Sequence, residues 1–109
     1  MSTQKETVDF ILETLGEPAV FAARAMFGEY ALYAKGKVVA LICDDQLYVK
    51  ILPASMELED VCEKDSPYTG AKLHYLVEEG QLSHIHNLPD ILLAIASALP
   101  TPKKKIQKK

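Results

Sequence analysis

The amino-acid sequence predicts an α+β fold, in which helices pack mainly on one face of an antiparallel β-sheet. Three observations support this prediction. Apolar residues recur at helical spacing in residues 4–15 and again in residues 88–99. Between them, residues 29–51 hold apolar runs that are joined by two-residue turns, and such short connections permit only antiparallel neighbours.

The first helix is predicted over residues 4–15. Thr3 stands three residues before Glu6, a spacing typical of the capping box, in which both side chains bond the backbone at the start of a helix. Gly16 suits the left-handed position after the helix, and Pro18 prevents its continuation. One apolar stripe is formed by Val8, Ile11, Leu12 and Leu15.

Residues 19–26 allow two interpretations. Their alanines favour a helix, whereas alternation along the segment allows an extended conformation. The alternating positions are Val20, Ala22, Arg24 and Met26. Because the segment leads directly into the predicted strands, we favour the extended form.

A three-stranded meander is predicted after this segment. Residues 29–34 form its first strand, and Lys35-Gly36 supplies a tight turn because Gly adopts positive φ readily. Residues 38–43 are continuously apolar, as in a central strand. Asp44-Asp45 makes the next turn, since Asp tolerates tight turn geometry, and residues 47–51 alternate as in a half-buried strand.

The rest of the chain is predicted to form a helix, at least one further strand and a last helix. Pro53 fits the first turn of a helix with a weak apolar face, made of Met56, Leu58, Val61 and Cys62. Turn residues at 66–70 precede a strand at 73–77, which ends in a turn at Glu79-Gly80. Asn87 is placed to cap the last helix. The apolar residues of that helix are Leu88, Ile91, Leu92, Ile95 and Leu99.

The composition is that of one globular domain, with 109 residues of which 49% are hydrophobic and 25% charged. We expect a single domain over residues 1–100 and a disordered Lys-rich tail over residues 101–109. No apolar run reaches the ~18 residues of a membrane span, and the polar N-terminus lacks a signal-peptide segment. Cys43 and Cys62 form no C-x-x-C motif, which predicts two buried free thiols. We therefore expect a cytoplasmic protein.

The net charge of -3 is unevenly divided along the chain. Residues 103–109 hold five of the 12 basic residues and no acidic one, so residues 1–102 carry 7 basic and 15 acidic residues, a net charge of -8. An acidic body repels nucleic acid, whereas a cationic tail attracts it. The candidate nucleic-acid contacts are Lys103, Lys104, Lys105, Lys108 and Lys109. A short run of like charge is also typical of a solvated chain end.

No sequence pattern typical of an enzyme is present. The five glycines are scattered through turns, and the nucleophile elbow and the H-E-x-x-H zinc motif are absent. Ser83 precedes His84, but neighbours in an extended segment point to opposite faces and form no nucleophile–base pair. His84 and His86 share one face of a strand and would need His74 or Cys62 to complete a metal site. Half-exposed histidines are the simpler interpretation, so we expect no catalytic residue, cofactor or metal.

Residues 24–50 carry the most specific pattern of the chain. R-A-M-F-G-E-Y-A-L-Y is followed by a glycine, a hydrophobic strand and D-Q-L-Y-V-K. This pattern resembles the N-terminal domain of the TfoX/Sxy proteins, whose sequence is close to R-x-M-F-G-G-Y-G-L-Y, a hydrophobic strand and D-x-L-Y-L-K. The matching residues are Arg24, Met26, Phe27, Gly28, Tyr30, Tyr33, Gly36, Asp45, Leu47, Tyr48 and Lys50.

The resemblance implies an α+β fold related to those of secretion chaperones, and it implies a regulatory role. TfoX proteins regulate natural competence in bacteria together with a transcription activator, and no catalytic residue comes with the family. We therefore expect a non-enzymatic interaction module with an unidentified protein partner, for which the transcriptional machinery is a candidate. Its contact surface would be a sheet edge or the sheet face with Tyr33 and Tyr48. The alternatives are a nucleic-acid-associated protein that binds through the Lys-rich tail, and a ligand site at the histidines. A homodimer is also compatible with a short antiparallel sheet.

Two residues depart from the family pattern. Glu29 and Ala31 stand where the family has glycines, which serve either close packing or contact with a partner. We expect Met26 and Phe27 to enter the core and Gly28 to turn the backbone into the meander. Replacement of Glu29 by glycine is predicted to leave the fold intact.

Overall fold

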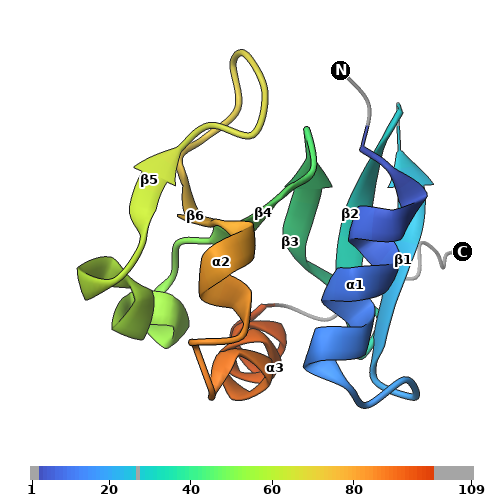
Figure 1. Cartoon of the computed structure of the whole chain (residues 1–109). Coiled ribbons are helices and arrows are strands. Elements are labelled where there is room, and N and C mark those ends of the chain that lie inside the picture. Colours follow the sequence, from blue (N-terminus) through green and yellow to red (C-terminus); the bar gives the residue numbers. More distant parts are fainter. Residues whose placement is uncertain (1–2, 27, 100–109) are drawn as a thin grey trace, which may run out of the picture.

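The computed structural model describes residues 3–26 and 28–99 of the chain. This part contains one six-stranded sheet with the order β1-β2-β3-β4-β6-β5, in which all neighbouring strands are antiparallel (Figure 1). The α+β prediction is therefore confirmed. The elements are α1 (Lys5–Leu15), β1 (Phe21–Met26), β2 (Glu29–Ala34), β3 (Lys37–Cys43), β4 (Gln46–Lys50), the 3-10 helix η1 (Pro53–Asp60), β5 (Glu63–Asp65), β6 (His74–Val77), α2 (Glu79–Leu82) and α3 (Leu88–Ala98).

The first helix and the strand after it follow the prediction from sequence. α1 ends at Leu15, and Gly16 follows with a φ of 70°. Residues 21–26 form β1, which confirms the extended interpretation of this segment. The predicted capping box is wrong, because Gln4 is the N-cap residue of α1 and no side-chain cap is present there. The hydroxyl of Thr3 instead bonds groups at the start of β2 and in the β3–β4 turn.

Both predicted two-residue turns are present, and they share one geometry. Lys35 and Gly36 have φ values of 52° and 82°, and Asp44 and Asp45 have φ values of 52° and 62°. Positive φ at both central residues is the mark of the type I′ turn, whose twist matches that of two antiparallel strands. The meander has four strands rather than the predicted three, because β1 pairs with β2 along its whole length.

A β-bulge divides the apolar run of β3 between the two faces of the sheet. Leu32 pairs with Ala40 and Tyr33 pairs with Val38, which leaves Val39 without a partner on β2. An extra residue of this kind lets consecutive side chains point to the same side. Val39 and Ala40 are accordingly both buried in the main core, whereas Leu41 belongs to a cluster on the opposite face.

The second half of the chain departs from the prediction at four places. The helix after Pro53 is a 3-10 helix, and Met56 and Val61 are exposed, because only positions such as Leu58 reach the core. β5 was not predicted, and the predicted turn at Glu79-Gly80 is the start of α2. Asn87 does not cap α3 with its side chain, which donates a hydrogen bond to Glu57 at 2.8 Å instead.

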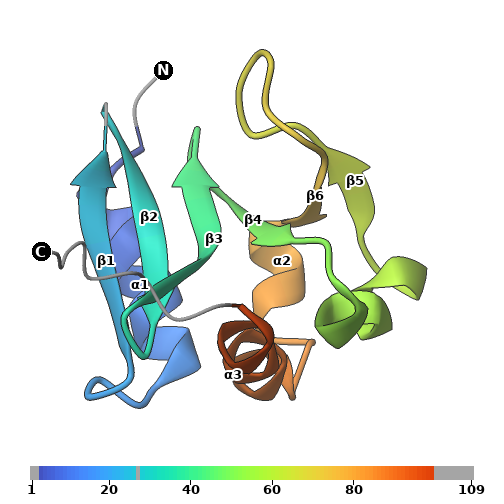
Figure 2. The same cartoon turned by 180° about the vertical axis from the view of Figure 1, so that it is seen from behind.

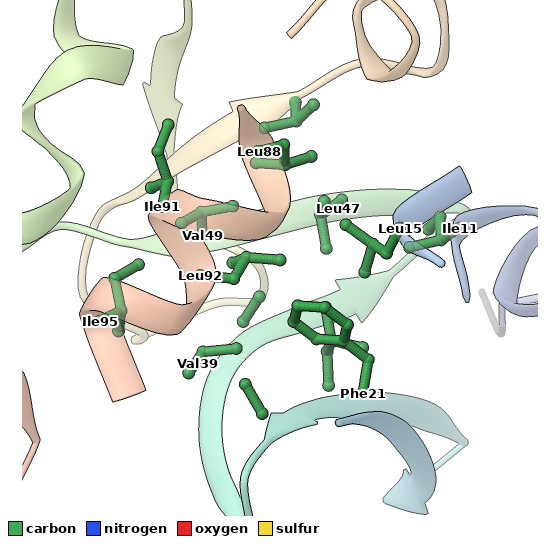
Figure 3. Close-up of a cluster of buried hydrophobic side chains, with 14 of the residues drawn as sticks. Ile11, Leu15, Phe21, Val39, Leu47, Val49, Leu88, Ile91, Leu92 and Ile95 are labelled. Atoms are coloured by element: carbon green, nitrogen blue, oxygen red, sulfur yellow. The ribbon is translucent and has the colours of Figure 1, made fainter. Parts of the chain in front are cut away.

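The main core lies between one face of the sheet and the helices (Figure 3). The helices contribute Val8, Ile11 and Leu15 from α1 and Leu88, Ile91, Leu92 and Ile95 from α3, all at most 4% exposed. The strands contribute Phe21, Val39, Leu47 and Val49. Full burial of an aliphatic side chain contributes about 1.5–3 kcal/mol, so this layer contributes strongly to the stability of the fold. α1 lies in front of β1 and β2 in Figure 1 and behind them in Figure 2, as expected for helices on one face.

Candidate interaction surface

The second face of the sheet, opposite the main core, carries a row of side chains that crosses all six strands. The register joins Arg24, Ala31, Leu41, Tyr48, Leu76 and Glu63 in one line of paired positions. Directly paired residues of antiparallel strands point to the same face. The row therefore begins with a cation on the edge strand β1, is apolar along its centre and ends with a carboxylate on the edge strand β5.

A hydrophobic cluster occupies the centre of this second face. It consists of Ala31, Leu41, Cys43, Tyr48 and Leu76, with Met26, Tyr33 and Val38 packed against it. All these residues come from strands, and no helix in residues 3–26 and 28–99 contributes a side chain to the cluster. The cluster members pack against one another, and Leu41 and Leu76 keep only 8% exposure. Figure 2 shows that the sheet carrying them is strongly twisted. In the described part of the chain, the second face is thus apolar without a covering layer of helices.

A hollow of about 460 Å³ opens at one end of the second face. Its walls include Met26 at the end of β1, Glu29 at the start of β2 and Cys43 at the end of β3. Tyr68 reaches the hollow from the loop between β5 and β6, which stands at the top of the molecule in Figure 2. The Tyr68 side chain is 57% exposed, so the hollow has an accessible aromatic ring on its wall.

Two hydrogen bonds hold the Glu29 carboxylate in place beside the hollow. The Thr3 hydroxyl donates to Glu29 Oε1, and the backbone N–H of Asp44 donates to the same oxygen at 3.1 Å. Thr3 Oγ1 also accepts a hydrogen bond from the backbone N–H of Asp45 at 3.2 Å. The segment before α1, the start of β2 and the β3–β4 turn are thereby joined at one point.

Asp45 takes the capping role that the sequence suggested for Thr3 and Glu6. Its Oδ1 accepts a hydrogen bond from the backbone N–H of Gln4 at 2.7 Å and from the Thr7 hydroxyl at 2.9 Å. A carboxylate at the start of a helix satisfies free backbone donors and interacts favourably with the helix dipole. The cap of α1 thus comes from a distant turn rather than from the helix's own sequence.

The thiol of Cys43 is kept protonated by its surroundings. Burial raises the pKa of Cys43 to about 11, and the negative charges of Glu29 and Asp44 add to this effect. Burial, together with the charge of Glu78, also raises the pKa of Cys62. Because the thiolate is the reactive form, neither thiol is activated for chemistry at neutral pH. Both cysteines are free and buried, as the sequence predicted.

Arg24 lies along the second face rather than away from it. Its guanidinium carbon lies 5.7 Å from the centroid of the Tyr33 ring, a distance at which a cation and an aromatic face attract each other. The two residues belong to neighbouring strands, since Ala22 pairs with Tyr33 and Arg24 pairs with Ala31. This contact places a positive charge at the β1 border of the apolar cluster.

The residues that match the family pattern are divided between the two faces of the sheet and the turns. On the second face lie Arg24, Met26, Tyr33, Tyr48 and Lys50. Tyr30 and Leu47 pack with the main core, and Gly28, Gly36 and Asp45 lie in turns, with a φ of 83° at Gly28. Met26 is half-buried against the second cluster rather than in the main core. Phe27 and the five lysines of residues 103–109 lie outside the described residues.

Four residues of this surface were not predicted from the sequence, namely Leu41, Leu76, Tyr68 and Thr3. The face on which Leu41 lies could not be predicted, because β3 is apolar at every position after Lys37. The bulge determines this face, and no sequence pattern indicates the bulge. Tyr68 reaches the surface only because its loop lies near the ends of β1 and β3. The pairing of Leu76 with Tyr48 could have been inferred from β6 as the next strand beside β4.

The histidines do not come together as a metal site. Residues 83–87 form no strand, so the strand face predicted for His84 and His86 is absent, although both histidines line one surface hollow beside Glu57. Nδ1 of His84 lies 2.8 Å from the carbonyl oxygen of Gly80, and His74 lies in β6 with its Nδ1 2.8 Å from the carbonyl oxygen of Lys72. In the part of the chain that the structure describes, no three His, Cys, Asp or Glu side chains gather as metal ligands.

These features define a small α+β domain built around one antiparallel sheet, with helices on one face and an apolar second face that no helix of the described residues covers. The chain belongs to the family described as the TfoX N-terminal domain, whose model matches residues 12–85. It is also 34% identical over 105 residues to a Spirochaeta aurantia protein described as an uncharacterized 12.7 kDa protein in the trpE 5' region. That match covers 96% of this chain and 90% of the relative. The family resemblance inferred from residues 24–50 is therefore confirmed.

Among the helices that the structure describes, none combines the length and the apolar character needed to cross a membrane.

Proposed function

We propose that this chain is a non-enzymatic regulatory module that binds a protein partner through the second face of its sheet. The observation that supports the proposal is the apolar row from Ala31 to Leu76, which is bordered by Arg24 and Glu63 and covered by no helix in residues 3–26 and 28–99. Protein interfaces commonly combine an apolar centre with a polar rim. Membership of the TfoX N-terminal domain family further supports a partner in the transcriptional machinery and a cytoplasmic location.

A pull-down experiment tests this proposal, with the full chain as bait in an extract of cells of its source organism. Val38 is half-buried on the second face, so Val38→Lys places a charge there with little loss of main-core packing. Val61 is 53% exposed and lies outside the second cluster, so Val61→Lys is the matched control. We expect a partner that binds the parent chain and Val61→Lys but not Val38→Lys. Equal capture by all three chains would contradict the use of this face, and circular dichroism checks that Val38→Lys is folded.

The second candidate function is association with nucleic acid through Lys103, Lys104, Lys105, Lys108 and Lys109. One observation favours it: Lys50 and Lys72 line a surface hollow together with Leu99, the last described residue before the Lys-rich segment. Lys37 Nζ also donates hydrogen bonds to the carbonyl oxygens of Ala96 and Leu99. Positive charges of the body therefore gather where the tail begins.

Fluorescence anisotropy with a labelled DNA duplex tests this alternative. Binding through the tail should weaken steeply as salt rises and should disappear when residues 103–109 are deleted. Lys64→Gln is the control for a general change of charge. Lys64 forms an ion pair with Glu59 at 2.9 Å and does not line the Leu99 hollow. Absence of binding at low salt would exclude the alternative.

A further inference from the structure

We infer that the hollow beside Glu29 receives the side chain of a lysine or an arginine from a basic segment of the partner. This inference rests on the proposed function and names the chemistry of the partner. It assigns the recognition of that basic side chain to Glu29 and Tyr68, with Met26 and Cys43 enclosing its aliphatic stem.

The Glu29 carboxylate is positioned by bonds to only one of its two oxygens. The Thr3 hydroxyl and the backbone N–H of Asp44 both bond Oε1. No group of residues 3–26 and 28–99 donates a hydrogen bond to Oε2. A carboxylate fixed through one oxygen keeps the other for an incoming cation, and a charge-assisted bond of this kind is stronger than a neutral one. Because the anchoring bonds order the side chain beforehand, the cation meets an oriented acceptor.

The other walls of the hollow suit the aliphatic stem of a basic side chain. Met26 and Cys43 line the hollow with sulfur-bearing side chains. The thioether of Met26 carries no charge, and the Cys43 thiol is neutral at pH 7 because its pKa is raised to about 11. The Tyr68 ring is exposed on the wall and attracts cations through its face. A volume of about 460 Å³ lies within the ~300–1,000 Å³ of small-ligand sites. Among the described residues, the hollow thus combines apolar walls with a carboxylate and an aromatic ring, which matches a long side chain with a cationic end.

The charges around the hollow exclude an anionic occupant. Glu29 and Asp44 make the local electrostatic potential negative, and the charge of each raises the pKa of the Cys43 thiol. Residues 1–102 as a whole carry a net charge of -8. An acidic group would meet like charge at the wall and in the body, whereas a basic segment would be attracted to both.

The test uses the full chain with ¹³C-labelled methionine methyl groups and follows them by NMR. n-Butylammonium reproduces the side chain of lysine, n-propylguanidinium that of arginine, and n-butanol and n-pentanoate are uncharged and anionic probes of similar length. We expect both cations to shift the Met26 methyl signal with saturation. The signal of Met56, which is 63% exposed and outside the hollow, should stay in place. Butanol and pentanoate should bind at least about tenfold more weakly, equivalent to ~1.4 kcal/mol.

Matched variants separate a charge effect from a change of fold. Glu29→Gln keeps an oxygen that accepts from Thr3 and Asp44 but removes the charge, and it should weaken the binding of n-butylammonium at least about tenfold. Glu63→Gln removes a carboxylate at the far edge of the second face and should leave the binding unchanged. Equal affinity for butanol, or full binding by Glu29→Gln, would overturn the inference.

Three further outcomes distinguish the occupant of the hollow from the use of the second face. If deletion of residues 103–109 strengthens the binding of n-butylammonium tenfold, the site is occupied by this chain's own basic tail, and the assignment to a partner is overturned. If Glu29→Gln still captures the partner while Val38→Lys does not, the second face is the interface but the hollow is not its basic-residue site. If the cations bind but no partner depends on Val38, the proposed function fails while the cation site stands.

Discussion

Thr3 and Glu29 are joined by a hydrogen bond from hydroxyl to carboxylate across a separation of 26 residues. Glu29 stands where the family pattern has a glycine, and a glycine cannot accept this bond. The residue that departs from the pattern thus connects the start of the chain to the β3–β4 turn, through Thr3 and through the backbone N–H of Asp44.

Glu29→Gly is expected to fold but to lose about 1–3 kcal/mol in the free energy of unfolding, because hydrogen bonds to a charged acceptor disappear and glycine weakens a strand. Urea denaturation measures the loss. Glu29→Gln is the control that keeps an acceptor oxygen and should lie closer to the parent chain. An unchanged denaturation midpoint for Glu29→Gly would show that the bonds to Thr3 and Asp44 do not stabilise the fold.

Asp45→Gly is expected to destabilise the protein by about 0.5–2 kcal/mol, because the N–H of Gln4 and the hydroxyl of Thr7 lose their acceptor at the start of α1. Asp44→Gly is the matched control in the same turn, where φ is also positive. It should change the stability by less than about 1 kcal/mol, since relief of left-handed strain offsets the added entropy of the unfolded chain. Equal thermal midpoints for the two variants would contradict a capping role of Asp45.

Lys37→Met is expected to loosen the end of α3. Lys37 Nζ donates to the carbonyl oxygens of Ala96 at 2.9 Å and Leu99 at 3.0 Å, which otherwise lack partners within the helix. Loss of these bonds should cost about 0.5–2 kcal/mol and should speed amide hydrogen exchange in the last turn of α3. Lys35→Met, in the exposed turn two residues earlier, should leave the exchange unchanged. Faster exchange in both variants would point to a general effect of lost charge.

The stability of the protein is expected to fall as pH rises from 9 to 11. The pKa of Cys43 is raised from 9.0 to about 11 in the folded chain, so in this window the unfolded thiol releases its proton before the folded one does. The folded state then binds more protons than the unfolded state, and its stabilisation below pH 9 is lost as pH approaches 11. Urea denaturation at pH 7 and pH 10 measures the change. Cys43→Ala should reduce the decrease, and an unaltered pH dependence would show that this thiol does not contribute.

The local order of the fold could be predicted because its strongest signals are local. Lys35-Gly36 and Asp44-Asp45 are turn residues whose tolerance of positive φ decides the strand connections, so two hairpins followed directly from the sequence. The helical stripe of α3 was equally clear. β5 escaped prediction because Glu63, Lys64 and Asp65 are all exposed, and a strand that buries none of its side chains shows no apolar pattern.

The candidate site could be predicted only in part, because it depends on contacts between distant segments. The strand alternation that joins Arg24, Tyr33 and Tyr48 on one face follows from the sequence once the register is known. The hollow does not, since Tyr68 joins it through the path of a loop. The bonds of Thr3 were also hidden, because the same residue satisfied a local capping pattern that the folded chain does not use.

The two borders of the sheet differ in how readily a further strand could pair with them. At one border, β5 exposes three consecutive charged side chains, and an incoming strand would have to remove water from all of them. At the other border, the six residues of β1 carry a single charge, that of Arg24. We therefore expect Arg24 to oppose strand addition at β1, so that solubility at high concentration depends more on this residue than on any charge of β5.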